Sequence, residues 1–118
     1  MQLLRNQAVI AEELIVADSF MKRFFGLMGR RNFLSGQGMY FPQCQSVHMW
    51  FMRIPLDIIF VKTVDTSNKK LIITSLHSSV RPWKLFPLLD LKAKAVLELP
   101  MGTISHFDLI EGDQLCIS

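Results

Sequence analysis

Alternating hydrophobic and polar positions predict a β-hairpin near the middle of the chain. Residues 57–64, "DIIFVKTV", and 70–77, "KLIITSLH", are rich in β-branched side chains and are separated by "DTSNK", a pattern typical of two antiparallel strands and their turn. If the hairpin is symmetric about Ser67, Val64 lies opposite Lys70, and Asp57 lies opposite His77. A bulge in the turn would shift this register.

Similar patterns predict further strands at residues 10–17, 36–41, 94–100 and 114–117. In 94–100, Glu98 alternates with Leu97 and Leu99, so it points to the opposite face. Residues 19–28, "SFMKRFFGLM", have the wide apolar face of a buried helix, and 101–109 reads as a short helical turn. We therefore expect a mostly β (α+β) fold, either an antiparallel β sandwich or a partly open barrel, with one α-helix in the N-terminal half.

Composition predicts one domain over residues 1–118, because half of the residues are apolar and only 19% are charged. No apolar run has the length of a membrane span, and the N-terminus lacks the apolar block of a signal peptide, which favours a cytoplasmic location. Cys44 and Cys116 are expected to be free thiols. A net charge of +3 is too small to indicate nucleic-acid binding by itself.

Five motifs then carry a family resemblance, in this order: "FFGLMGRRNF", "GMYF", "HMWFMRIPLDIIFV", "VLELPMGTI" and "EGDQL". Together they resemble the domain of unknown function 192 (DUF192) family from about Phe20 to Leu115. The resemblance implies a compact, mostly β domain with one helix carrying "GLMGR", and it implies no established activity. Relatives often carry a signal peptide, so the missing leader is a departure from the family pattern.

A cross-strand Asp57–His77 pair would suit a hydrolase-like enzyme, since an aspartate can orient an imidazole that acts as a general base. The chain has no G-x-S-x-G nucleophile motif. The structural alternative is an ion pair of Asp57 with His77 or Arg53, which is common outside active sites.

A metal centre or cofactor is not predicted. His48, His77 and His106 do not show the spacing of a metal-binding motif, and the sequence leaves open whether they converge. The run "HMWFM", with Trp50, is better explained as a strand that packs against the helix face.

Glu98 needs a partner if its strand is covered on both faces, and Arg30 in the "GLMGRR" segment is a candidate for a salt bridge. A two-carboxylate site formed by Asp57 and Glu98, as in glycosidases, is a weaker alternative.

The segment 80–94, "VRPWKLFPLLDLKAK", combines basic residues with Trp83 and Phe86. Such a loop suits an anionic ligand, through Arg81, and a stacking contact, through Trp83. It equally suits a surface loop whose aromatic residues fill the core.

Our leading hypothesis is a non-enzymatic accessory domain that binds a small ligand or a protein segment. The proposed binding residues are Arg30, His48, Trp50, Asp57, Arg81, Trp83 and Glu98. The alternative is a hydrolase-like enzyme using Asp57 and His77. A homodimer formed through an exposed strand edge is a third option, and nucleic acid is disfavoured as a partner.

Overall fold

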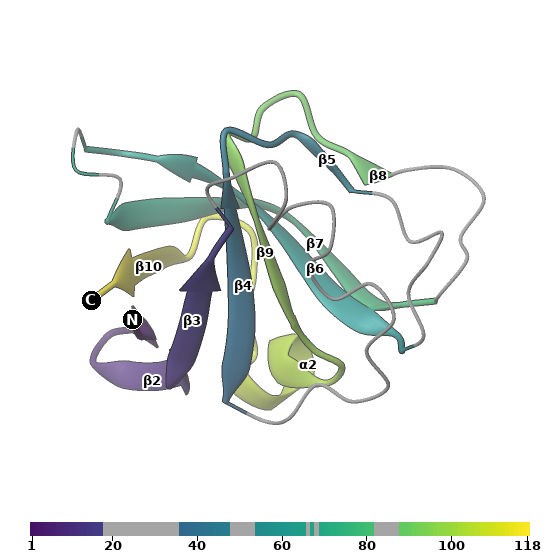
Figure 1. Cartoon of the computed structure of the whole chain (residues 1–118), viewed down its shortest axis with the longest axis horizontal. Helices are drawn as coiled ribbons and strands as arrows, with labels where there is room; N and C mark the ends of the chain where they lie inside the picture. Colours follow the sequence, from purple (N-terminus) through teal and green to yellow (C-terminus); the bar gives the residue numbers. More distant parts are fainter. Residues whose placement is uncertain (18–35, 48–53, 66, 68, 82–87) are drawn as a thin grey trace.

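The computed structural model describes residues 1–17, 36–47, 54–65, 67, 69–81 and 88–118. In these residues the chain forms mainly β-strands, which pair into one eight-stranded sheet and one two-stranded ladder (Figure 1). The strands are β1 (Leu3–Arg5), β2 (Ala8–Ala11), β3 (Glu13–Val16), β4 (Gln37–Pro42), β5 (Ser46–Val47), β6 (Leu56–Thr63), β7 (Lys70–Val80), β8 (Leu88–Leu89), β9 (Ala95–Pro100) and β10 (Gln114–Ile117). The order in the large sheet is β2-β1-β10-β7-β6-β9-β4-β3, and β5 pairs with β8.

The sheet is open, because no ladder between described residues joins its edge strands β2 and β3. A backbone hydrogen bond of 2.8 Å does connect the Leu14 N–H in β3 to the Met1 carbonyl, which precedes β1. All pairs in the large sheet are antiparallel except β3 with β4, which run parallel. The mostly β prediction is therefore confirmed, and the sheet is not a closed barrel.

Two hydrophobic clusters divide the faces of this sheet. The first, here called the inner cluster, draws on every strand of the large sheet and consists of Leu3, Ile10, Ala11, Leu14, Tyr40, Ile59, Val61, Leu71, Ile73, Ala95, Leu97, Leu99, Ile104, Leu109, Leu115 and Ile117. The second, the outer cluster, lies on the opposite face of the central strands and consists of Ala17, Met39, Phe41, Leu56, Ile58, Phe60, Val80, Ala93 and Val96. Strands β6 and β9 contribute to both clusters, which explains their nearly continuous hydrophobic sequences.

The helix that the structure describes is α2 (Thr103–Phe107), which packs Ile104 into the inner cluster. It confirms the helical turn predicted at 101–109. It also corrects the fold prediction, which placed the helix in the N-terminal half. The segment predicted to carry that helix, 19–28, lies outside the described residues.

The β6–β7 hairpin follows the predicted register only near its turn. Thr63 lies opposite Leu71, and the Val64 N–H donates a hydrogen bond of 3.0 Å to the backbone carbonyl of Lys70, as predicted. The register then shifts between Phe60 and Val61 and again between Leu56 and Ile58. Each shift inserts one extra residue in β7, which is the geometry of a β-bulge.

Within the described ranges, no helix is long and apolar enough to cross a membrane. The cytoplasmic location stays a prediction.

Candidate ligand site on the outer face of the sheet

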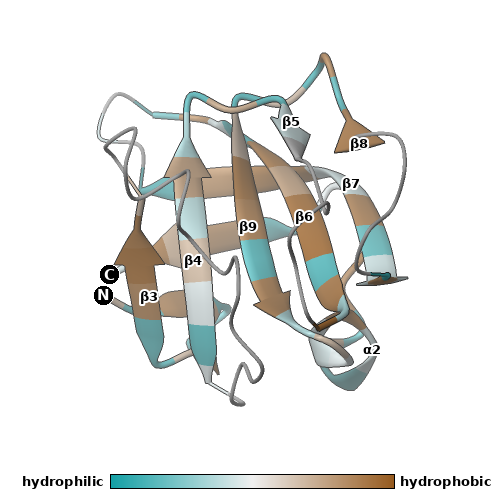
Figure 2. Cartoon of the chain, turned by 45° about the vertical axis from the view of Figure 1, so that its right-hand side comes forward, coloured by the Kyte–Doolittle hydropathy of each residue, from teal (hydrophilic) through white to brown (hydrophobic). Residues whose placement is uncertain are grey.

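Glu98 occupies the middle of β9, on the outer face. Its neighbours Leu97 and Leu99 belong to the inner cluster, whereas Val96 belongs to the outer one. The alternation predicted from the sequence is therefore confirmed. Figure 2 shows one hydrophilic band within an otherwise hydrophobic β9.

Strand pairing places Glu98 in a row of four side chains, here called the outer row. Ile58 lies opposite His77 on one side and opposite Glu98 on the other, and Glu98 in turn lies opposite Met39. Directly opposed residues point to the same face, so the row His77–Ile58–Glu98–Met39 crosses β7, β6, β9 and β4. Because neighbouring strands are about 4.8 Å apart, the backbones at His77 and Glu98 are separated by roughly 10 Å.

The Glu98 carboxyl is almost completely buried without a described partner. The residue is 6% exposed, and none of the described residues donates a hydrogen bond to it. Fully enclosed polar side-chain atoms in the described part of the chain all have partners, so the Glu98 oxygens keep a small contact with solvent. Burial among apolar side chains raises the pKa of Glu98 to about 7. The group can therefore take up or release a proton near neutral pH.

His77 contributes an aromatic ring to the same face. It packs edge-to-face against Phe60, with ring centroids 5.6 Å apart and an interplanar angle of 84°. Phe60 belongs to the outer cluster. A titratable carboxyl and an imidazole therefore lie on one face, separated by the side chain of Ile58.

The predicted Asp57–His77 pair is wrong. His77 lies opposite Ile58 because the bulge between Phe60 and Val61 shifts β7 by one residue. Asp57 therefore points to the other face, where its cross-strand neighbour Leu99 belongs to the inner cluster.

Asp57 instead holds two segments of backbone together. Its Oδ1 accepts a hydrogen bond from the Ser79 N–H and its Oδ2 accepts one from the Ile104 N–H, both at 2.8 Å. Ser79 has a left-handed backbone, with φ of 52°, and Ile104 lies in the first turn of α2, which has no side-chain cap of its own. Asp57 therefore supports the strained end of β7 and caps α2 from a distance.

The alternative site with two carboxylates is also wrong. Asp57 and Glu98 lie on adjacent strands, but Asp57 faces inward and Glu98 outward. They cannot act on one substrate from the two sides of the sheet.

Asp90 forms a polar centre that the sequence did not reveal. Its Oδ2 accepts hydrogen bonds from the hydroxyls of Thr74 and Ser75, both at 2.7 Å, and its Oδ1 accepts one from the Lys92 N–H. Desolvation raises the pKa of Asp90, but these hydrogen bonds and the Lys92 charge outweigh it and leave the pKa lowered. The bulge in β7 aligns the two hydroxyls, which is why hydrophobic periodicity could not indicate this site.

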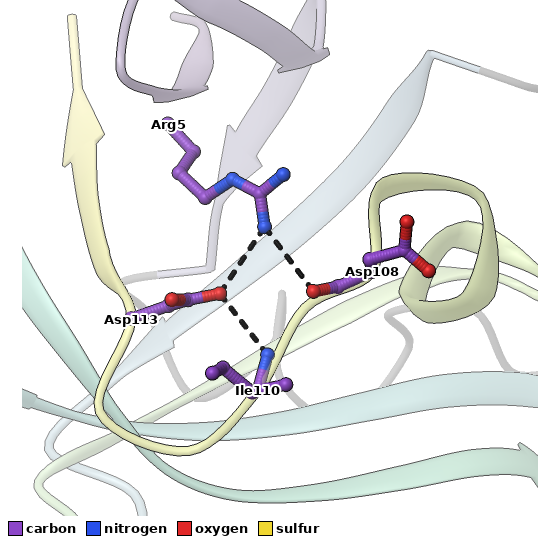
Figure 3. A network of polar contacts seen from close by, with 4 residues as sticks. All are labelled: Arg5, Asp108, Ile110 and Asp113. Carbon is purple, nitrogen blue, oxygen red and sulfur yellow. Dashed lines mark hydrogen bonds and ion pairs between the residues drawn. The ribbon is translucent and has the colours of Figure 1, made fainter.

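A second network joins the two ends of the chain (Figure 3). The guanidinium of Arg5 contacts Asp113 Oδ2 at 3.1 Å and the Asp108 carbonyl at 3.4 Å, and Asp113 also accepts a hydrogen bond from the Ile110 N–H. Its role is structural, because Asp113 Oδ2 accepts both bonds and so closes the turn before β10 and fastens it to Arg5 in β1.

A cleft of about 460 Å³ lies beside α2. It is lined by Val9, Ile10, Glu12, Gly36, Pro100, Met101, Gly102, Thr103, His106 and Phe107. The His106 ring packs edge-to-face against Phe107.

The remaining predicted site residues are only partly described. Arg81 is exposed just after β7, whereas Arg30, His48, Trp50 and Trp83 lie outside the described residues. His106, in α2, lines the cleft, while His77 lies on the outer face. Across the described ranges, no group of three histidine, cysteine, aspartate or glutamate side chains could hold a metal ion.

Comparison with known proteins places the chain in a family. The DUF192 family model, described as "Uncharacterized ACR", matches residues 2–117, and the chain belongs to this family. It is 32% identical over 104 residues to a UPF0127 protein of Thermococcus sibiricus, a match covering 85% of this chain and 62% of that protein. The chain thus spans about three-fifths of that relative's length. A UPF0127 protein of Pyrococcus furiosus is 32% identical over 106 residues, covering 87% of this chain and 84% of the relative.

A solved structure of similar fold comes from Novosphingobium aromaticivorans and is a protein of unknown function. It superimposes with a TM-score of 0.72 at 26% identity, covering 86% of this chain and 72% of that one. The family expected from the five motifs is therefore confirmed.

Proposed function

We propose that the domain is a non-enzymatic binding module whose small ligand contacts Glu98 on the outer face of the sheet. The observation that carries the proposal is the buried carboxyl of Glu98, which has no hydrogen-bond donor among the described residues. Carboxyl groups in apolar surroundings usually have hydrogen-bond donors, so one that has none among the described residues and keeps only a small contact with solvent is a candidate functional group.

The surroundings of Glu98 support binding through shape and apolar contact. Ile58 and Met39 flank it across the sheet, and Val96 lies two residues away on the same face of β9. Ligand sites typically combine such apolar walls with a few polar groups that fix the orientation of the ligand.

The structure gives no support to the hydrolase-like alternative in the form in which we predicted it. Asp57 is engaged by two backbone N–H groups on the inner face, and His77 lies on the other face. A protein partner or a homodimer stays a prediction.

A thermal-shift screen tests the proposal. The full chain would be screened with amines, carboxylates, sugars, nucleotides and divalent metals. A ligand at a hundred times its dissociation constant adds about 2.7 kcal/mol to the free energy of unfolding, which raises the melting temperature by roughly 10 °C.

The variant Glu98→Gln should lose the shift that a ligand produces, and the matched control Glu111→Gln, at an exposed turn position, should keep it. The proposal fails if no compound gives a shift that depends on Glu98.

A further inference from the structure

We propose that the group presented to Glu98 is a cationic nitrogen, such as a primary ammonium, attached to an apolar body. This inference rests on the proposed function, because it names the ligand class for the same site. It makes ligand binding dependent on the ionisation of Glu98.

The first argument is that none of the described residues compensates the charge of the carboxyl. Glu98 lies between Ile58 and Met39 in the outer row, and neither side chain can donate a hydrogen bond. An ionised carboxylate in such surroundings is costly unless an opposite charge and hydrogen-bond donors accompany it. An ammonium group supplies both, since it carries a positive charge and three N–H donors.

Other ligand groups fit less well. A hydroxyl can donate one hydrogen bond but brings no charge, so it leaves the ionised form of Glu98 uncompensated. An anion would be repelled by the ionised carboxylate. The charge of the site therefore selects the cation, while the outer cluster around it selects an apolar body.

The second argument is the charge distribution on the outer face. Among the described residues, β9 and β4 present no charged side chain beside Glu98, and β7 presents His77 in the same row. Lys62 lies on β6 at the exposed end of the strand, beyond Phe60. The outer face also carries Glu13, at the exposed start of β3, and Asp90, which accepts a hydrogen bond from Ser75 opposite Phe60. Glu98 differs from both because it is buried and has no described hydrogen-bond donor.

The proton linkage follows from these groups. With a pKa of about 7, Glu98 is mostly protonated at pH 6 and mostly ionised at pH 8. A cation should then bind about tenfold more tightly at pH 8 than at pH 6, as the ionised fraction rises by about that factor.

Isothermal titration calorimetry of the full chain with n-hexylammonium and with n-hexanol, at about pH 6 and pH 8, tests this inference. We expect hexylammonium to bind about tenfold more tightly at the higher pH and hexanol to bind more weakly, without a pH dependence. Glu98→Gln should remove the pH dependence and weaken hexylammonium binding to the level of hexanol, whereas Glu111→Gln should bind like the unaltered chain.

The outcomes separate this inference from the proposed function. Equal binding of hexylammonium and hexanol, or unchanged hexylammonium binding by Glu98→Gln, overturns the cationic ligand class. If hexylammonium fails while another compound in the screen gives a Glu98-dependent shift, the ligand class is wrong and the binding function stands. If no compound gives such a shift, both are wrong.

Discussion

Two buried acids, Asp57 and Glu98, lie on adjacent strands of the same sheet but differ in the hydrogen-bond donors around their carboxyl groups. Asp57 is completely buried on the inner face and accepts hydrogen bonds from two backbone N–H groups. Glu98 is 6% exposed on the outer face and accepts none from the described residues. The same sheet thus satisfies one carboxylate fully and leaves the other with a pKa near 7.

The difference separates a structural acid from a candidate functional one. Asp57 contributes to folding by joining β6, the end of β7 and α2 through its two oxygens. Glu98 opposes folding whenever it is ionised, because burial disfavours its charged form. A protein that retains such a group at a cost in stability is expected to use it.

Asp57→Ala should produce the largest effect. It leaves the N–H groups of Ser79 and Ile104 without their acceptor. The Ile104 donor is buried and costs about 1–3 kcal/mol when unsatisfied, whereas the Ser79 donor is only partly buried and costs less. We expect the free energy of unfolding to fall by roughly 2–5 kcal/mol and the melting temperature by about 10 °C or more.

Chemical denaturation, with Glu111→Ala at an exposed turn position as a control, measures this loss. A loss of less than about 1 kcal/mol would show that Asp57 is not the structural acid of the pair.

Glu98→Gln should have the opposite sign and a strong pH dependence. The folded state binds the Glu98 proton more tightly than the unfolded state, whose pKa is near the ordinary 4.5. The free energy of unfolding therefore falls as the pH rises from about 4.5 to about 7, and is flat above that. Because one pKa unit corresponds to about 1.4 kcal/mol, removing the charge should stabilise the protein by up to roughly 3 kcal/mol at pH 8 and by little at pH 4.

Melting curves between these pH values measure the effect. Glu111→Gln should leave the pH profile unchanged. A Glu98→Gln profile parallel to that of the unaltered chain would contradict the burial argument.

The sequence predicted the position of Glu98 correctly but not the partners of Asp57. Alternation in β9 correctly placed Glu98 on the face opposite Leu97 and Leu99, because a strand has a fixed period of two. The pairing of Asp57 with His77 was predicted from a hairpin register symmetric about Ser67, and it is wrong because an extra residue in β7 shifts the register and leaves no hydrophobic signature.

The polar networks were not predictable, because they join residues that are distant in sequence. Arg5 reaches Asp113 across 108 positions, and Asp57 reaches Ile104 across 47. The helical turn at α2 and the hairpin turn were predicted correctly, since short-range periodicity and turn residues determine them.

Asp90→Asn tests how much a carboxylate outside the hydrophobic clusters contributes to stability when hydrogen-bond donors surround it. Replacing one carboxylate oxygen with an amide group removes an acceptor that Thr74 and Ser75 share, or that Lys92 uses. The free energy of unfolding should fall by about 1–2 kcal/mol at neutral pH.

Because the pKa of Asp90 is lowered in the folded state, its contribution is present above the ordinary pKa of an aspartate and is lost as the pH falls through the lowered value. This is opposite to the behaviour expected for Glu98. Equilibrium unfolding at neutral and acidic pH, with Glu111→Gln at an exposed turn position as a control, distinguishes the two.

Arg5→Met, which removes the centre of the network in Figure 3, should have the smallest effect of the series. The side chains of Arg5 and Asp113 are both 24% exposed, and partly exposed ion pairs contribute about 1 kcal/mol or less. Methionine keeps most of the apolar contact of the arginine stem. We expect a decrease of at most about 1 kcal/mol that shrinks further in high salt, because screening weakens the pair that is lost. A larger decrease that does not depend on salt would mean that Arg5 stabilises the fold through buried hydrogen bonds, as Asp57 does, and not through a partly exposed ion pair.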